Sequence, residues 1–195
     1  MTTRPLEDLL NDSRVRPEVK TILRREYPST EASYSIFVEH SHAVADYAVE
    51  LAQRAGARVD FVREAAWLHD VGIKYTRAPG INCHGDEPYL KHGIIGRDIC
   101  DAEGLHEHGL VCERHVGTGL TIEEIERQQL PLPRREMLCQ TLEERIVCYA
   151  DQFFSKSSRH RLTLENLSRR IKRHGESGWI RFQQMHLEFG SLEGS

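Results

Sequence analysis

Trp67-Leu68-His69-Asp70-Val71-Gly72 is the stretch around which this chain is organised. It reads as an apolar helix end that presents a histidine and an aspartate side by side and then stops. Neighbouring residues on a helix point about 100° apart, so His69 and Asp70 can bind one ion only from a helix end. Gly72 predicts that the helix ends there. An imidazole beside a carboxylate in this position can hold a divalent metal ion.

The composition is typical of a globular protein that folds in water. Hydrophobic residues make up 39% of the 195 residues, charged residues make up 29%, and the mean hydropathy is -0.53. No apolar run approaches the roughly 20 residues that cross a bilayer, and residues 1–10 lack the layout of a signal peptide. We therefore expect a cytoplasmic protein that does not bind a membrane. The net charge of -4 gives no general reason to expect nucleic acid as a partner.

Apolar spacing and capping residues predict helices along the whole chain. No segment shows the alternation or the turn pairs of a β-hairpin. The expected helices cover residues 5–10, 17–27, 35–55, 61–70, 89–103, 107–115, 122–129, a segment that begins at Thr141 and carries Asp151, 163–174 and 177–189. The sequence therefore predicts an all-α fold, a helical bundle around a buried metal site. Residues 76–87 are expected to form a loop over the mouth of that site.

We expect one domain built from three parts, because 195 residues suit a single hydrophobic core. The N-terminal helices of residues 1–34 would pack on a metal-binding core formed by residues 35–156. Residues 157–195 would add C-terminal helices to the same domain.

Several polar residues lie among apolar helical residues, where an unpartnered polar group is costly. They are His40, His69, His92, His115 and Asp151. Taken singly, each histidine would be interpreted as a core side chain bonded to a backbone carbonyl. Five such residues from five helices, with Asp70 beside them, favour a shared metal ion instead. His42 lies on the same expected helix as His40, and periodicity alone does not choose between the two.

Three motifs connect these residues to a known family. His40–Ala52 follows the pattern His-Ser-x-x-Val-Ala-x-x-Ala-x-x-Leu-Ala, the central stretch reads Trp-Leu-His-Asp-Val-Gly, and Asp151 ends Ile-Val-Cys-Tyr-Ala-Asp. In these motifs the chain resembles the HD-domain superfamily of metal-dependent phosphohydrolases, in its HDIG-like branch, over about residues 38–154. The resemblance selects His40 over His42 as the first ligand.

Members of that superfamily with two metal ions add two histidines between the His-Asp pair and the last aspartate. Here these are His92 in His-Gly-Ile-Ile-Gly and His115 in Glu-Arg-His-Val-Gly. The resemblance therefore implies a dinuclear site in which Asp70 bridges two divalent ions. The ligands would be His40, His69, Asp70 and Asp151 for one ion and Asp70, His92 and His115 for the other. Iron or manganese is favoured, and cobalt, nickel, zinc or magnesium also suits these ligands.

Two such ions lower the pKa of a bridging water and hold the oxygens of a phosphoryl group. We therefore expect a phosphohydrolase that acts on a small phosphorylated metabolite, and the resemblance favours a nucleotide or dinucleotide polyphosphate. Asp70 and Lys74 are the expected catalytic residues. The candidates for binding the substrate are Lys74, Arg114, Arg97 and His84.

Other interpretations of the same residues stay open. Di-iron oxygenases similar to myo-inositol oxygenase use the same fold and ligand types, so ligand identity alone does not separate hydrolysis from oxygen activation. A non-catalytic, nucleotide-sensing HD module is the third hypothesis. The basic residues 159–161 and 169–174 are interpreted as a solvated helix face, with steering of an anionic substrate or contact with RNA as alternatives. The oligomeric state is also open, with a homodimer as one option.

Overall fold

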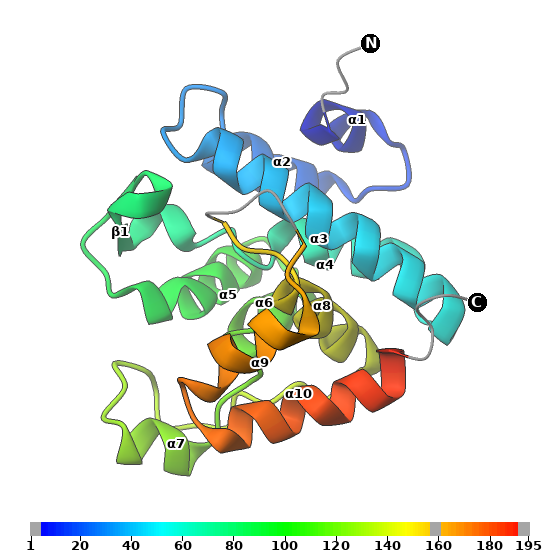
Figure 1. The fold of residues 1–195 in the computed structure, drawn as a ribbon. Helices are drawn as coiled ribbons and strands as arrows, with labels where there is room; N and C mark the ends of the chain where they lie inside the picture. Colours follow the sequence, from blue (N-terminus) through cyan, green and yellow to red (C-terminus); the bar gives the residue numbers. More distant parts are fainter. Residues whose placement is uncertain (1–4, 157–160, 191–195) are drawn as a thin grey trace.

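The structure is a computed structural model that describes residues 5–156 and 161–190, and it is mostly helical (Figure 1). The helices are α1 (Pro5–Asn11), α2 (Pro17–Glu26), α3 (Tyr34–Ala55), α4 (Val59–Leu68), α5 (His92–Ala102), α6 (His106–Arg114), α7 (Ile122–Arg127), α8 (Leu142–Gln152), α9 (Leu164–Lys172) and α10 (Glu176–Phe189). Single 3-10 turns lie at Ile73–Tyr75, Pro79–Ile81 and Tyr89–Lys91. The predicted all-α fold is confirmed. Within the described residues, no helix is long and apolar enough to cross a membrane.

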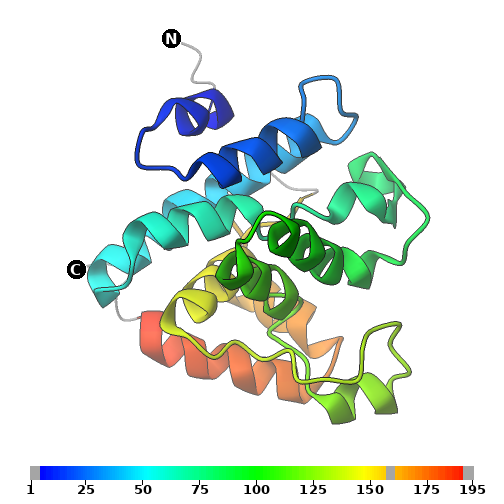
Figure 2. The ribbon, with the colours of Figure 1, turned by 180° about the vertical axis from the view of Figure 1, so that it is seen from behind.

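Helix α3 is the centre of the bundle. It packs against α4 on one side and α8 on another, and α5 packs against α6. Seen from behind, α5 and α6 lie side by side in the middle of the molecule (Figure 2). The N-terminal helices α1 and α2 cover one end, and α9 and α10 lie at the opposite end against α8 (Figure 1).

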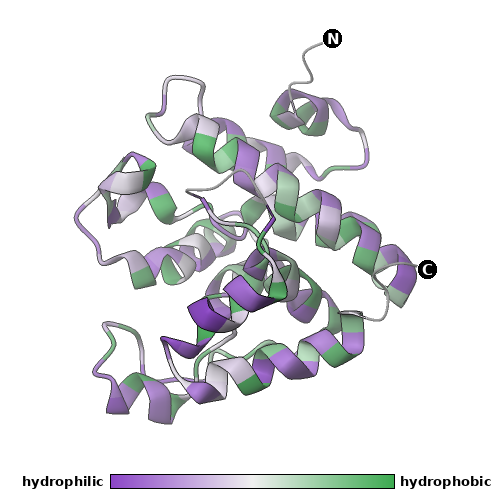
Figure 3. Ribbon diagram, viewed as in Figure 1, coloured by the Kyte–Doolittle hydropathy of each residue, from purple (hydrophilic) through white to green (hydrophobic). Residues whose placement is uncertain are grey.

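One hydrophobic core runs through the whole bundle. It includes Leu23 from α2, Leu51 from α3 and Phe182 from α10, each of them fully buried. Most helices are amphipathic, with hydrophobic and hydrophilic residues mixed along one ribbon (Figure 3). The expected division into three parts stays a prediction, and residues 157–160 at its second boundary lie outside the described residues.

Residues 76–87 differ from the expected loop without strands. Strands β1 (Arg77–Ala78) and β2 (Cys83–His84) pair antiparallel, with Arg77 opposite His84. The connection between them includes Asn82, whose φ of 57° lies in the left-handed region that asparagine tolerates. Each strand has only two residues, which are too few to show an alternating pattern, so the sequence does not predict them.

Helix α4 ends at Leu68, two residues before the expected end. His69 keeps helical dihedral angles as the C-cap, and the chain then turns, with the amide of Val71 bonded to the carbonyl of Leu68 at 2.9 Å. This turn presents the side chains of His69 and Asp70 at the helix end, as the sequence predicts.

Gly72 lets this turn approach α5 closely. A Cβ atom at Gly72 would lie 2.3 Å from the carbonyl oxygen of His92 and 2.7 Å from the amide nitrogen of Gly96. Both neighbours are backbone atoms of α5, which cannot rotate away as a side chain can. The absence of a side chain at Gly72 therefore sets the distance between the His-Asp turn and the helix that begins with His92.

We expect Gly72→Ala to lower the free energy of unfolding by about 1–3 kcal/mol, because the added methyl group forces α5 away from the turn. The matched control is Gly80→Ala, where a Cβ atom would have nothing within 4 Å. The control should change stability by less than about 0.5 kcal/mol. Urea denaturation followed by circular dichroism measures both, and equal stabilities would refute the close-approach argument.

Candidate metal centre

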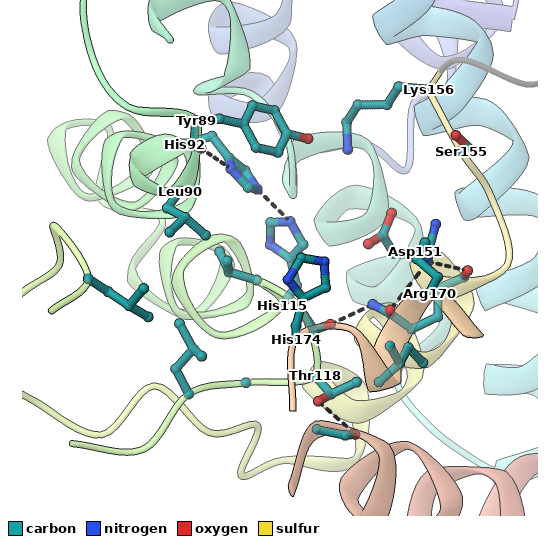
Figure 4. Close-up of a pocket in the computed structure, with 18 of the residues that line it drawn as sticks. Tyr89, Leu90, His92, His115, Thr118, Asp151, Ser155, Lys156, Arg170 and His174 are labelled. Carbon is teal, nitrogen blue, oxygen red and sulfur yellow. Dashed lines mark hydrogen bonds between the residues drawn. The ribbon is translucent and has the colours of Figure 1, made fainter. Parts of the chain in front are cut away.

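The structure brings the six expected ligands together in two overlapping groups, with His92, His115 and Asp151 visible in Figure 4. One group contains His40, His69, Asp70 and Asp151, and the other contains Asp70, His92 and His115. Within each group the ligand atoms lie within 4.8 Å of one another. They come from the buried face of α3, the end of α4, the start of α5, the C-cap of α6 and the last turn of α8. Five helices therefore meet at this point.

The first group surrounds one oxygen of Asp70. The Nε2 atom of His40 lies 3.2 Å from Oδ2 of Asp70 and 3.0 Å from Oδ1 of Asp151. The Nε2 atom of His69 lies 3.3 Å from Oδ2 of Asp70 and 3.5 Å from Oδ1 of Asp151. Two imidazoles and two carboxylates thus point at a common centre.

The second group surrounds the other oxygen of the same carboxylate. The Nε2 atoms of His92 and His115 each lie 3.5 Å from Oδ1 of Asp70. These two nitrogens are 3.2 Å apart. Asp70 therefore turns one oxygen to each group, which is the arrangement of a bridging carboxylate.

Backbone carbonyls orient three of the imidazoles through the nitrogen that faces away from the centre. His69 donates from Nδ1 to the carbonyl of Ala66 at 2.6 Å. His92 donates in the same way to Tyr89 at 2.6 Å, and His115 donates to Cys112 at 2.7 Å. Such a bond fixes the ring and leaves Nε2 as the atom aimed at the ligand site. Each carbonyl lies three residues before its histidine, so the helix turn itself supplies the acceptor.

The carboxylate of Asp70 is fully buried, and among the described residues its oxygens face the ammonium group of Lys156 at 2.6 Å and the Nε2 atoms of the four histidines at 3.2–3.5 Å, with no backbone amide donating to it. Burial raises the pKa of Asp70, but the charges of Lys156 and His69 outweigh it and hold the pKa well below its usual range. A buried anion is costly unless cations compensate its charge. The site therefore fits divalent metal ions, and its imidazole and carboxylate donors suit iron or manganese.

The histidines of the two groups differ in how they hold protons. Burial lowers the pKa of His69, but Asp70 and Asp151 outweigh this effect and raise it to about 10. Burial lowers the pKa of His92 to about 3, so this imidazole is neutral at pH 7. A metal ion has to displace a proton from His69 but not from His92.

Lys156 is a part of the site that the sequence analysis missed. Its Nζ atom lies 2.6 Å from Oδ2 of Asp70, and only 14% of its side chain is exposed. Burial lowers the pKa of Lys156, but Asp70 and Tyr89 outweigh it and raise the pKa above its usual value. The signal that could have found Lys156 is its position five residues after Asp151, because cations close to an expected ligand are candidates for binding the substrate.

The structure does not bring the four expected substrate-binding residues to the cluster. Lys74 donates from Nζ to the carbonyl of Glu26 at 2.8 Å and lies 3.1 Å from its carboxylate. Arg114 pairs with the carboxylate of Glu144 at 2.8 Å. None of the four lines the pocket that contains the ligands.

The other two expected residues also lie away from the cluster: one pairs with a buried acid, and the other is at the surface. Arg97 pairs with Glu113, which is 2% exposed, and His84 is an exposed residue of β2. Glu26, Glu113 and Glu144 are all buried, so the cations that neutralise them stabilise the fold. The burial of these three acids is not predictable from the residues around them in the sequence.

His42 faces away from the cluster, as the choice of His40 requires. Its side chain is 39% exposed, and its Nδ1 atom lies 3.4 Å from Asp46. Its ring stacks on Trp67 with the ring centres 6.1 Å apart.

A cavity of about 610 Å³ opens onto the cluster (Figure 4). At the metal end it is lined by Tyr89, His92, His115, Asp151 and Lys156. Its lining also includes the apolar side chains of Leu120, Leu130 and Ile171. This volume suits a small organic molecule.

Comparison with known proteins places this geometry in a family. The model of the HD domain matches residues 37–155. An uncharacterized protein of Methanocaldococcus jannaschii, MJ0778, is 39% identical over 128 residues, which are 63% of this chain and 68% of that protein. A tRNA (cytidine(56)-2'-O)-methyltransferase of Thermoplasma volcanium is 32% identical over 126 residues. The match covers 64% of this chain but only 33% of that longer protein.

Solved structures show the same fold. The HD domain of the phosphodiesterase PgpH of L. monocytogenes superposes with a TM-score of 0.51 at 17% identity, covering 89% of this chain and 88% of that one. Its complex with cyclic-di-AMP gives the same TM-score at 19% identity, covering 89% and 87%. The matched family model, the shared helical fold and the buried histidines and aspartates agree, and this chain belongs to the HD domain family.

Proposed function

We propose that this chain is a phosphohydrolase that uses two divalent metal ions to cleave a phosphoester or phosphoanhydride bond in a small phosphorylated metabolite. The observation that carries the proposal is the position of Asp70, whose two oxygens face two separate groups of ligands at the end of an open pocket. The family match and the fold shared with a phosphodiesterase support hydrolysis over other chemistry.

His40, His69 and Asp151 would hold one ion, His92 and His115 would hold the other, and Asp70 would touch both. When bound, such ions supply a water of lowered pKa and positive charge for the oxygens of a phosphoryl group. The protein contributes the orientation of the ligands, because Ala66, Tyr89 and Cys112 fix three of the rings through their carbonyls.

Lys156, whose ammonium group lies beside Asp70 and lines the pocket, would bind the phosphoryl group of the substrate. Its ammonium group lines the pocket, is charged at neutral pH because its pKa is raised, and lies at the metal end. An ammonium group there can donate hydrogen bonds to a phosphoryl oxygen as negative charge develops on it. Lys156 therefore takes the role that the sequence analysis gave to Lys74.

A nucleotide is the substrate class that the pocket supports. The apolar walls formed by Leu120, Leu130 and Ile171 suit the flat, weakly polar face of a base, while the phosphate lies at the metal end. The related HD domain of PgpH binds cyclic-di-AMP, which is also a nucleotide. The methyltransferase relatives share only part of their length with this chain, and we carry no methyl transfer over to it.

Asp70→Ala should abolish the binding of both metal ions, because its carboxylate is the single ligand common to the two groups. His92→Ala should remove one ion and keep the other. Metal content after loading with manganese and gel filtration, measured by mass spectrometry, gives the stoichiometry. The control is His42→Ala, on the same helix as His40 but facing away, which should keep the full content. Loss of metal in His42→Ala would overturn the assignment of His40.

Lys156→Gln should lower kcat/KM for phosphate release by about 10²–10³-fold with the metal content retained, because one donor to the developing charge is lost. Lys156→Arg should recover part of that loss, since it keeps the positive charge. The assay is phosphate release from a panel of nucleotides by the manganese-loaded protein. Oxygen uptake by an iron-loaded protein without phosphate release would establish the oxygenase instead. Tight nucleotide binding without turnover would establish the sensing module.

A further inference from the structure

A second pocket lies beside the metal pocket, and its lining is rich in arginine. It is formed by Ser155, Leu162, Asn166, Arg169, Arg170 and Arg173, which we call the arginine pocket. Among the described residues that line it there are three guanidinium groups and no carboxylate. Its electrostatic potential is therefore positive, which suits an anion.

The two pockets share part of their walls. Ser155 and Arg170 line both of them, and Lys156 follows Ser155 directly in the chain. Figure 4 shows Ser155 and Arg170 on the same side of the metal pocket as Asp151, across from Tyr89 and His92. The arginine pocket therefore adjoins the metal pocket along Ser155 and Arg170.

Arg170 is held in place between the pockets. It donates to the backbone carbonyl of Gln152 at 2.6 Å, and the side chain of Gln152 in turn bonds to the carbonyl of Gly117. These bonds connect α9 to the end of α8 and to the segment that follows His115. The wall between the two pockets is thus fixed relative to the metal ligands.

The face of α9 that carries the arginines is set by its buried side. Leu167 and Ile171 are buried against the core, so the helix presents Arg169 and Arg173 to solvent. Arg169 pairs with Glu165, but both side chains are more than 70% exposed, and such an i,i+4 pair is weak and screened by salt. Like charges crowded on one helix face repel one another, and an anion bound between them removes that cost.

We propose that the arginine pocket is a second anion subsite, which binds a phosphate of the same small molecule whose other phosphoryl group lies at the metal centre. The ligand class is a nucleotide that carries more than one phosphate group. A guanidinium group can donate two parallel hydrogen bonds to two oxygens of one phosphate, which gives both affinity and a preferred orientation. This inference rests on the proposed function only in stating which phosphoryl group is cleaved.

A small ligand is favoured over RNA by the shape and the charge of the site. The guanidinium groups are gathered in one pocket that joins the metal pocket, whereas contact with RNA needs a basic surface that follows a long backbone. The net charge of the whole chain is -4, which disfavours such a surface.

The test is the double variant Arg169→Gln/Arg173→Gln in metal-loaded protein. Two probes are titrated by calorimetry: the phosphonate analogue of AMP and an ATP analogue, each with a methylene group in place of every phosphoester and bridging oxygen, so that neither probe is cleaved. We expect the Kd of the ATP analogue to rise about tenfold, because two charged donors are lost, and the Kd of the AMP analogue to change less than about twofold. Equal changes for the two probes, or no change for either, would overturn the subsite.

The matched control is Arg24→Gln/Arg54→Gln, which removes the same charge from α2 and α3, away from both pockets. Arg54 pairs with Glu50 at i,i+4 as Arg169 pairs with Glu165, so the loss of a surface ion pair is matched as well. In the control variant both Kd values should lie within about twofold of those of the unsubstituted protein. Arg173→Gln alone serves as a second variant should the double variant unfold early on heating.

Binding is measured without turnover, so the two proposals fail in different ways. If the double variant selectively raises the Kd of the ATP analogue but the protein releases no phosphate, the subsite proposal holds and the hydrolase proposal is wrong. If the protein releases phosphate but the double variant does not selectively raise that Kd, the hydrolase proposal holds and the subsite proposal is wrong. If the double variant binds a 20-nucleotide RNA more weakly and the Kd of the ATP analogue is unchanged, the surface binds nucleic acid and the subsite proposal is wrong.

Discussion

The buried charge of Asp70 is the constraint on which the rest of this structure depends. The carboxylate is fully buried, yet the charges of Lys156 and His69 beside it lower its pKa and hold it in its charged form. Moving a carboxylate out of water costs several kcal/mol, so cationic or metal partners have to surround it. The arrangement of five helices around one point follows from this requirement, because no single helix can deliver partners to both carboxylate oxygens.

Close contacts at glycines determine where those partners lie. Gly72 brings the turn after α4 against the backbone of α5, and a Cβ atom at Gly93 would lie 2.5 Å from the carbonyl of Cys112 in α6. That same carbonyl accepts the bond from Nδ1 of His115. The two glycines therefore connect the turn of Asp70, the start of α5 and the end of α6 at fixed distances. The second group of ligands owes its geometry to backbone packing as much as to its own side chains.

The sequence predicted which histidines and aspartates meet at the cluster better than it predicted the charged groups around them. His40 and Asp151 were recognisable because a histidine or an aspartate in an apolar helix needs a partner, and the family motif then selected His40 over His42. The pairing of Lys74 with buried Glu26 could not be predicted, because the residues around Lys74 do not show that an acid on another helix is buried. Lys156 was missed because it follows the end of α8, outside any periodic pattern. Side chains fixed by local pattern are predictable, and those fixed by distant partners are not.

The distribution of acids separates the cations that stabilise the fold from those that can bind an anion. Arg114 faces Glu144, and Arg97 faces Glu113, and each of these acids is no more than 3% exposed. Releasing Arg114 to a ligand would take away the arginine that pairs with buried Glu144, and releasing Arg97 would leave buried Glu113 with Arg135 as its cation, so each release would destabilise the fold. Arg169, by contrast, faces an acid whose side chain is 72% exposed and that water can solvate once the arginine turns away. Closeness to a proposed metal ligand in the sequence does not separate Lys156, which lines the pocket, from Arg97 and Arg114, which do not line it. Among the arginines, the difference is whether the paired acid is exposed, because water can solvate an exposed acid once the arginine turns to a ligand.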